Sequence, residues 1–245
     1  MTGTGFIVVS PRGRFLITNR HVLSGRKPGS NEYLDPKRRV NPTSIRITAT
    51  TQDDEGVLVK QTSTMQLITS ELDATWIEHP DGGADIDVSA LCLADEAVSL
   101  AHALNMQRPP VIDDSEYRFT PAVPDRVMIV GYPFGRNGGA TGVGVWVQGT
   151  IASEFHLPID GLPRFLVDSR TRPGMSGSPV YLNPAGRMYN PVGREGLYSV
   201  APEDTTQLVG IYSGRVSSDS DLGFVWHAKT ILEVIDGGVP GSVFS

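Results

Sequence analysis

The chain has 245 residues, enough for the core of one large domain or of two domains of about 120 residues each. Its formal net charge of −6 argues against nucleic-acid binding as the main activity, and no apolar stretch is long enough to span a membrane. Cys92 is the single cysteine, which excludes a disulfide within the chain.

Two features bear on where the protein works. The start, M-T-G-T-G-F, lacks the basic and apolar regions of a secretory signal. Together with the single cysteine this predicts a cytoplasmic protein, although a secreted chain whose signal had been removed would read the same. Cys92 lies in the apolar run S-A-L-C-L, so we expect a small buried side chain rather than a redox or metal-binding residue.

Short runs of Val, Ile, Leu and Thr between turn residues predict an all-β protein. The strands expected in the first half are 5–10, 15–18, 44–49, 57–60, 65–69 and 76–80. The polar, basic segment 24–42 is expected to be a solvated loop or, because it follows a histidine, a loop that contacts a substrate or partner.

The middle of the chain predicts a boundary. Residues 95–104 have a short helix-like pattern, and the proline-rich polar passage that follows resembles a linker, which divides the chain into 1–115 and 116–245. The strands expected beyond it are 126–132, 143–151, 163–167, 179–182 and 207–214. Apolar residues at helical spacing predict a closing helix over 224–235.

Three motifs carry residues that could do chemistry. The strand F-L-I-T-N-R-H-V leads into His21, and A-D-I-D-V-S-A-L-C-L places acids at the start of another strand. Ser176 lies in R-P-G-M-S-G-S-P-V-Y, where glycine and proline favour a tight loop. Such a loop can hold the hydroxyl outward while the amides of Gly174 and Ser176 turn toward one point. His79 and His102 are expected to be ordinary surface or capping residues.

These motifs, in the order His, Asp, Ser, resemble those of the trypsin-like (chymotrypsin-fold) serine proteases, in particular bacterial-type members without disulfides. The resemblance implies two six-stranded antiparallel β-barrels with a C-terminal helix and an active site in the cleft between them. The barrel within 1–115 would carry the histidine and the aspartate, and the barrel within 116–245 would carry the serine.

Carried over residue by residue, the resemblance makes His21 the general base, Asp85 its orienting acid and Ser176 the nucleophile. Gly174 and Ser176 would donate the oxyanion hydrogen bonds. Asp87 is the open alternative for the acid, because strand alternation places both aspartates on one face. The match to an aspartate that opens a D-I-x-V strand favours Asp85.

The implied function is that of a serine endopeptidase acting through an acyl-enzyme, without a metal or organic cofactor, on protein or peptide substrates. A regulatory protein partner is compatible with this function. The primary pocket would be lined by Arg170, Thr171, Tyr212, Ser213 and Arg215, with Ser213 also supporting the aspartate. Because no acid is among them, we expect small apolar or acidic residues before the cleaved bond rather than Lys or Arg.

Two alternatives remain. A chymotrypsin-fold module that has lost catalysis could bind peptides or a partner, since fold does not fix function. An α/β-hydrolase would use Ser176, then Asp204 or Asp221, and then His227. The sequence G-M-S-G-S departs from the G-x-S-x-G expected there, which disfavours that second reading.

Overall fold

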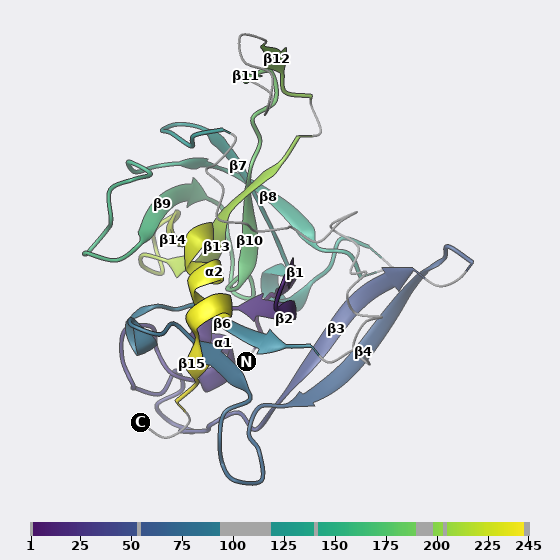
Figure 1. Ribbon diagram of the computed structural model, residues 1–245, viewed down its shortest axis with the longest axis vertical. Coiled ribbons are helices and arrows are strands. Elements are labelled where there is room, and N and C mark those ends of the chain that lie inside the picture. Colours follow the sequence, from purple (N-terminus) through teal and green to yellow (C-terminus); the bar gives the residue numbers. More distant parts are fainter. Residues whose placement is uncertain are drawn as a thin grey trace.

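The computed structural model describes residues 2–52, 55–93, 119–139, 142–189, 198–202 and 205–242. Strands dominate these residues, and two α-helices and short 3₁₀ turns join them (Figure 1). The predicted all-β class is therefore confirmed. The short elements between the main strands are α1 (Arg20–Ser24), η1 (Gly83–Asp85), η3 (Pro133–Gly135), β11 (Met188–Tyr189) and β12 (Ser199–Val200).

The second half of the chain forms a closed six-stranded antiparallel barrel. Around the barrel the strands follow the order β10-β13-β14-β9-β8-β7. Alternate side chains such as Phe165 and Val167 point inward and are fully buried, as expected for a small barrel filled by side chains. The six strands are β7 (Arg126–Gly131), β8 (Val145–Ile151), β9 (Arg164–Ser169), β10 (Ser178–Leu182), β13 (Gln207–Arg215) and β14 (Leu222–His227).

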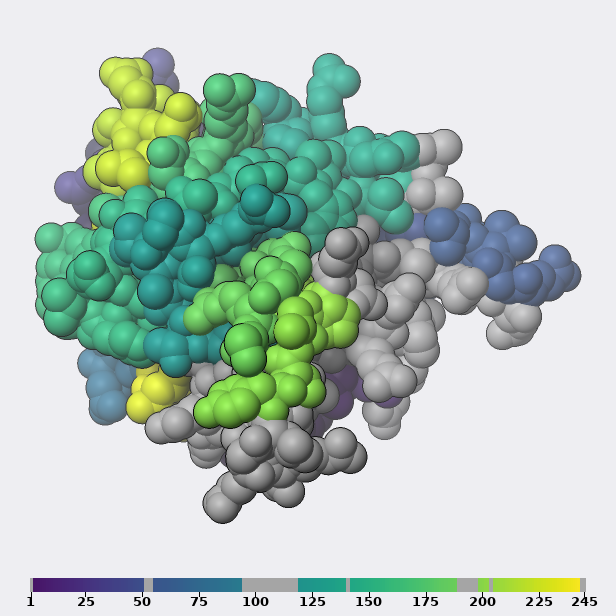
Figure 2. Space-filling view, turned by 90° about the horizontal axis from the view of Figure 1, so that it is seen from above, coloured from purple at the N-terminus to yellow at the C-terminus, as the bar shows by residue number. Residues whose placement is uncertain are grey.

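The described strands of the first half, together with β15 from the C-terminal end of the chain, form two sheets. A five-stranded sheet has the order β1-β2-β6-β5-β15, and a long hairpin of β3 and β4 is separate from it. This hairpin projects from one side of the molecule in both views (Figures 1 and 2). The strands are β1 (Phe6–Ser10), β2 (Gly13–Thr18), β3 (Ser44–Gln52), β4 (Leu58–Gln66), β5 (Trp76–Glu78), β6 (Ser89–Cys92) and β15 (Val239–Pro240).

Two details of this half correct the sequence-based predictions. The segments predicted as separate strands at 57–60 and 65–69 belong largely to one strand, β4, which pairs with β3 along its whole length. Cys92, predicted to be buried, is exposed at the end of β6, where the chain leaves the sheet.

The C-terminal helix α2 (Ala228–Gly237) begins four residues later than the sequence pattern predicts. The residues at 224–227 instead complete β14, because hydrogen bonds to β13 on one side and β9 on the other hold them in the barrel. The apolar face of α2, including Ile231 and Ile235, packs against Phe6 and Ile17 of the first half and Trp226 of the second. The helix thus joins the two halves through a shared hydrophobic cluster.

The polar segment 24–42 has structure of its own. Arg26 is buried, with its guanidinium 3.8 Å from the centre of the Tyr33 ring and its Nη2 donating to Asn41 Oδ1 at 2.9 Å. Substrate or partner contact by this segment stays a prediction.

The helix-like piece at 95–104, His102 and most of the expected linker lie outside the described residues, and the division at 115/116 likewise stays a prediction. Within the parts of the chain that are described, no helix is long and apolar enough to cross a membrane.

Candidate active site

His21 lies where β2 ends and α1 begins, and both residues before it are anchored. Asn19 is fully buried and its Nδ2 donates to the backbone carbonyl of Asp87 at 2.7 Å. Arg20 is buried too, and its Nε lies 3.0 Å from Glu78 Oε2 of β5. A buried cation needs such a partner, so this ion pair fixes the start of α1 against the sheet.

Asp87 supports the His21 ring. Its side chain is fully buried, with Oδ2 2.7 Å from His21 Nδ1 and Oδ1 accepting the His21 backbone N–H at 2.9 Å. Ser213 Oγ also donates to Oδ2, at 2.5 Å. A carboxylate accepts hydrogen bonds, so His21 Nδ1 carries the proton and Nε2 is left as the basic nitrogen.

This arrangement corrects the choice of Asp85. Asp85 is the exposed last residue of η1, and the extended backbone begins only at Ile86. Ile86 and Val88 are buried in the hydrophobic core, so Asp87 between them points to the opposite side, toward His21. The signal in the sequence was the position of Asp87 between two apolar residues, whereas Asp85 follows the turn residues G-G-A.

Ser176 lies in the loop between β9 and β10, and its Oγ donates to the backbone carbonyl of Ser213 at 2.9 Å. Ser213 therefore touches the serine through its carbonyl and Asp87 through its hydroxyl. Among the described residues Ser176 makes no hydrogen bond with His21. Rotation about the Cα–Cβ bond would be needed to turn the Ser176 hydroxyl from Ser213 to the imidazole.

The backbone around Ser176 is turned so that two amides have no partner among the described residues. Gly174 has φ +97° and Gly177 has φ +89°, and a Cβ at Gly177 would lie only 2.0 Å from the Thr4 carbonyl oxygen. Both positions therefore require glycine. Within the described part of the chain the N–H groups of Gly174 and Ser176 have no hydrogen-bond partner. Both are therefore available to bind an oxyanion.

The residues predicted to line the primary pocket differ in how deeply they are buried. Thr171 and Tyr212 are buried and their side-chain oxygens lie 2.5 Å apart, with the Tyr212 ring packed over Gly223. Burial raises the pKa of Tyr212, and the Thr171 hydrogen bond and the positive charges of Arg215 and Arg172 oppose the rise.

Two guanidinium groups are thus close enough to influence the Tyr212 phenol, and Arg172 is one that the sequence interpretation missed. It is held by an ion pair with Asp221 at 3.7 Å and donates to the Thr171 carbonyl at 2.8 Å. Arg170, which the sequence interpretation did include, is exposed.

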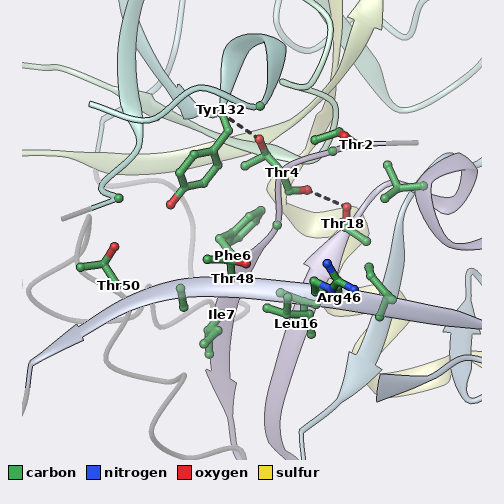
Figure 3. A pocket seen from close by; sticks show the side chains of 18 of the residues that line it. Thr2, Thr4, Phe6, Ile7, Leu16, Thr18, Arg46, Thr48, Thr50 and Tyr132 are labelled. Carbon is green, nitrogen blue, oxygen red and sulfur yellow. Dashed lines mark hydrogen bonds between the residues drawn. The ribbon is translucent and has the colours of Figure 1, made fainter. Parts of the chain in front are cut away.

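A cavity of about 730 Å³ lies between the β3–β4 hairpin and the strands β1 and β2 (Figure 3). The described residues that line it include Thr4 and Thr18 but none of His21, Asp87 and Ser176. In the same described ranges no group of three His, Cys, Asp or Glu side chains is placed to hold a metal ion.

His79 and His227 lie outside this site and contact neither Asp87 nor Ser176 through any hydrogen bond among the described residues. His79 Nε2 lies 3.2 Å from Glu233 of α2, while its Nδ1 accepts backbone N–H groups of the next turn. His227 ends β14 of the closed barrel and packs edge-on against Phe155, with ring centroids 4.5 Å apart. Asp221 pairs with Arg172, and Asp204 lies outside the described residues.

His227 should make the protein less stable in acid. Its pKa is lowered from 6.5 to about 4, first by burial and second by the nearby His156. As the pH falls through this interval the unfolded chain binds a proton that the folded protein does not, so stability falls. Between about pH 7 and about pH 4.5 the urea midpoint of His227→Gln should therefore fall less than that of the wild type. Equal falls in both proteins would contradict this assignment.

Comparison with known proteins gives one matching family and several similar solved structures. The family model described as "Trypsin-like peptidase domain" matches residues 3–189. A search of curated proteins finds no match.

Among solved structures, the chain is similar to an inactive form of Rv3671c from M. tuberculosis H37Rv, with 18% identity, 96% of this chain and 80% of that chain covered, and a TM-score of 0.44. It is similar to the thermostable serine protease AL20 from an extremophilic microorganism, with 12% identity, 95% and 88% covered, and a TM-score of 0.47. It is also similar to catalytically inactive tobacco etch virus protease complexed with substrate, with 13% identity, 98% of this chain and 86% of that chain covered, and a TM-score of 0.42.

Proposed function

The chain belongs to the trypsin-like peptidase family, and we propose that it is a serine endopeptidase whose triad is His21, Asp87 and Ser176. The observation that carries the proposal is the contact of Asp87 with the Nδ1 of His21, which leaves the other ring nitrogen free to act as a base. Ser176, with the free amides beside it, supplies the second half of the chemistry.

In the proposed reaction the Ser176 hydroxyl first turns from the Ser213 carbonyl toward His21 Nε2. The imidazole removes the hydroxyl proton while Oγ attacks the carbonyl carbon of a peptide bond. The negative charge that develops on the carbonyl oxygen is stabilised by the N–H groups of Gly174 and Ser176, and Asp87 stabilises the imidazolium.

Collapse of the tetrahedral intermediate breaks the C–N bond, and His21 returns the proton to the departing amine. The acyl group then remains on Ser176 Oγ. Water, deprotonated by His21, attacks this ester and releases the carboxylic acid product, which restores the free serine.

We propose that the two halves of the chain divide the task. The part within 1–115 supplies His21 and Asp87, and the part within 116–245 supplies Ser176 and Ser213. The site would then lie between the halves, as in the expected cleft between barrels.

One observation favours the catalytically silent alternative. The Ser176 hydroxyl donates to Ser213 rather than to His21, which is not the attacking geometry. Incubation of the wild type and of Ser176→Ala with a peptide library separates the two functions. Cleavage by the wild type alone supports the endopeptidase, and binding without cleavage supports the module.

The same library tests specificity. We propose that the Tyr212 ring over Gly223 makes the primary pocket shallow and that Arg215 and Arg172 bring positive charge to it, so we expect small apolar or acidic residues before the cleaved bond. Arg215→Ala should reduce cleavage after Glu or Asp by roughly tenfold relative to cleavage after Ala. The exposed Arg170→Ala is the matched control and should preserve the preference. Dominant cleavage after Lys or Arg would contradict the assignment.

A further inference from the structure

Thr4, just before β1, touches the nucleophile loop with both its backbone and its side chain. Its N–H donates to the carbonyl oxygen of Ser176 at 2.7 Å, and its Oγ1 donates to the carbonyl oxygen of Gly174 at 2.8 Å. Thr4 is 4% exposed, so water does not compete freely for these bonds.

Thr4 is itself held from both halves of the chain. Its Oγ1 accepts the Tyr132 backbone N–H at 3.2 Å, and its carbonyl accepts the Thr18 hydroxyl at 2.7 Å (Figure 3). Because the hydroxyl accepts from Tyr132, its own proton is directed to Gly174. The group therefore has one orientation rather than several.

The two carbonyls that Thr4 holds flank the peptide between Met175 and Ser176. That peptide carries the Ser176 N–H, one of the two unpaired amides, and its own carbonyl accepts the Ser178 N–H at 3.0 Å. The peptide before Gly174 is held in the same manner, since Phe134 N–H donates to the Pro173 carbonyl at 2.6 Å. Four successive carbonyls are thus directed at protein donors, and the amides of Gly174 and Ser176 face away from them.

We propose that Thr4 is a positioning residue that holds the oxyanion hole of the nucleophile loop in its working conformation before substrate arrives. This inference rests on the proposed endopeptidase function. It adds a residue from the first half of the chain to a loop that belongs to the second half. Preorganised donors stabilise a transition state because they need not be reordered during the reaction.

The packing around Thr4 makes the hydroxyl hard to replace. A Cβ at Gly131 would lie 2.9 Å from Thr4 Oγ1, and a Cβ at Gly3 would lie 3.3 Å from the Ser176 carbonyl oxygen. Valine has the shape of threonine, so Thr4→Val leaves no extra room for a water molecule. The Gly174 carbonyl would then lose its donor, and the hydrogen bond from the Met175 N–H to the Arg172 carbonyl at 3.1 Å would alone hold this peptide.

The test measures hydrolysis of a peptide substrate by the wild type, Thr4→Val and Thr4→Ser. We expect Thr4→Val to lower kcat by roughly tenfold to hundredfold with little change in KM, since removal of an oxyanion donor itself costs about 10²–10³-fold. Thr4→Ser keeps the hydroxyl and should recover most of the rate. Thr230→Val is the matched control: Thr230 is 1% exposed, its hydroxyl has no hydrogen-bond partner within the described residues, and its loss should not change kcat.

A second readout separates positioning from a general loss of structure. A peptide aldehyde forms a hemiacetal oxyanion on Ser176, so its affinity should fall in Thr4→Val by the same factor as kcat/KM. The affinity of an uncleaved peptide for Ser176→Ala should be the same with and without Thr4→Val. Should Thr4→Val not fold, as judged by circular dichroism, Thr4→Ala is measured in its place with the same loss expected.

A folded Thr4→Val protein with kcat and aldehyde affinity within about twofold of wild type would overturn the role of Thr4 alone. A wild type that neither cleaves peptides nor binds the aldehyde would overturn the proposed function, and the role of Thr4 with it.

Discussion

Replacing Ser176 by alanine is expected to lower kcat by roughly 10⁶-fold while the protein stays folded. The hydroxyl supplies the oxygen that forms the acyl-enzyme, and no neighbouring group can take its place. Its only hydrogen bond within the described residues goes to the Ser213 carbonyl, so its removal should have little effect on stability. Hydrolysis of the best library peptide gives kcat, and urea unfolding gives the stability.

His21→Ala should lose almost as much, because the two groups act as a unit and their effects are not additive. A folded Ser176→Ala protein that retained more than about one thousandth of the wild-type kcat would show that another residue is the nucleophile.

Asp87→Asn is expected to lower kcat by about 10⁴-fold. An asparagine can present its NH₂ group to His21 Nδ1, which would hold the ring in the tautomer whose Nε2 carries the proton and cannot act as a base. The matched variant is Asp85→Asn, which changes an exposed side chain in η1 and should leave kcat within about twofold of wild type.

Rates measured across pH for both variants complete this test. In Asp87→Asn the loss should persist throughout the active range, since the defect lies in the tautomer and orientation of the ring. A greater loss in Asp85→Asn than in Asp87→Asn, with both proteins folded, would identify Asp85 as the orienting acid. It would contradict the proposed role of Asp87.

His21 and Ser176 were proposed from the sequence because local patterns mark them. His21 follows directly after an apolar strand, and Ser176 lies among glycines whose positive φ angles the loop requires. The all-β class and most strands of the barrel were also predicted, since alternation along each strand reports which face is buried.

Features that depend on where a turn ends were harder to predict. Asp85 and Asp87 share a strand face only if both are extended, and the 3₁₀ turn of η1 removes Asp85 from the strand. At 224–227 the apolar spacing fits a helix or a strand, and pairing with β13 and β9 decides for the strand. Cys92 is apolar in sequence context yet exposed at a strand end.

Contacts between distant parts of the chain left no local signal at all. Thr4 lies 170 residues from the Gly174 carbonyl that it binds, and nothing in G-T-G-F indicates that contact. Arg172, whose charge acts on Tyr212, was missed for the same reason, since the local sequence does not distinguish it from the exposed Arg170 and its partner Asp221 lies far along the chain.

The most direct test of the central claim is labelling with a fluorophosphonate, which reacts with serine hydroxyls that a neighbouring base activates. We expect one label per chain, located on Ser176 by peptide mass mapping, and none on Ser176→Ala or His21→Ala. Absence of labelling on the folded wild-type protein, or a label on another residue, would contradict the claim.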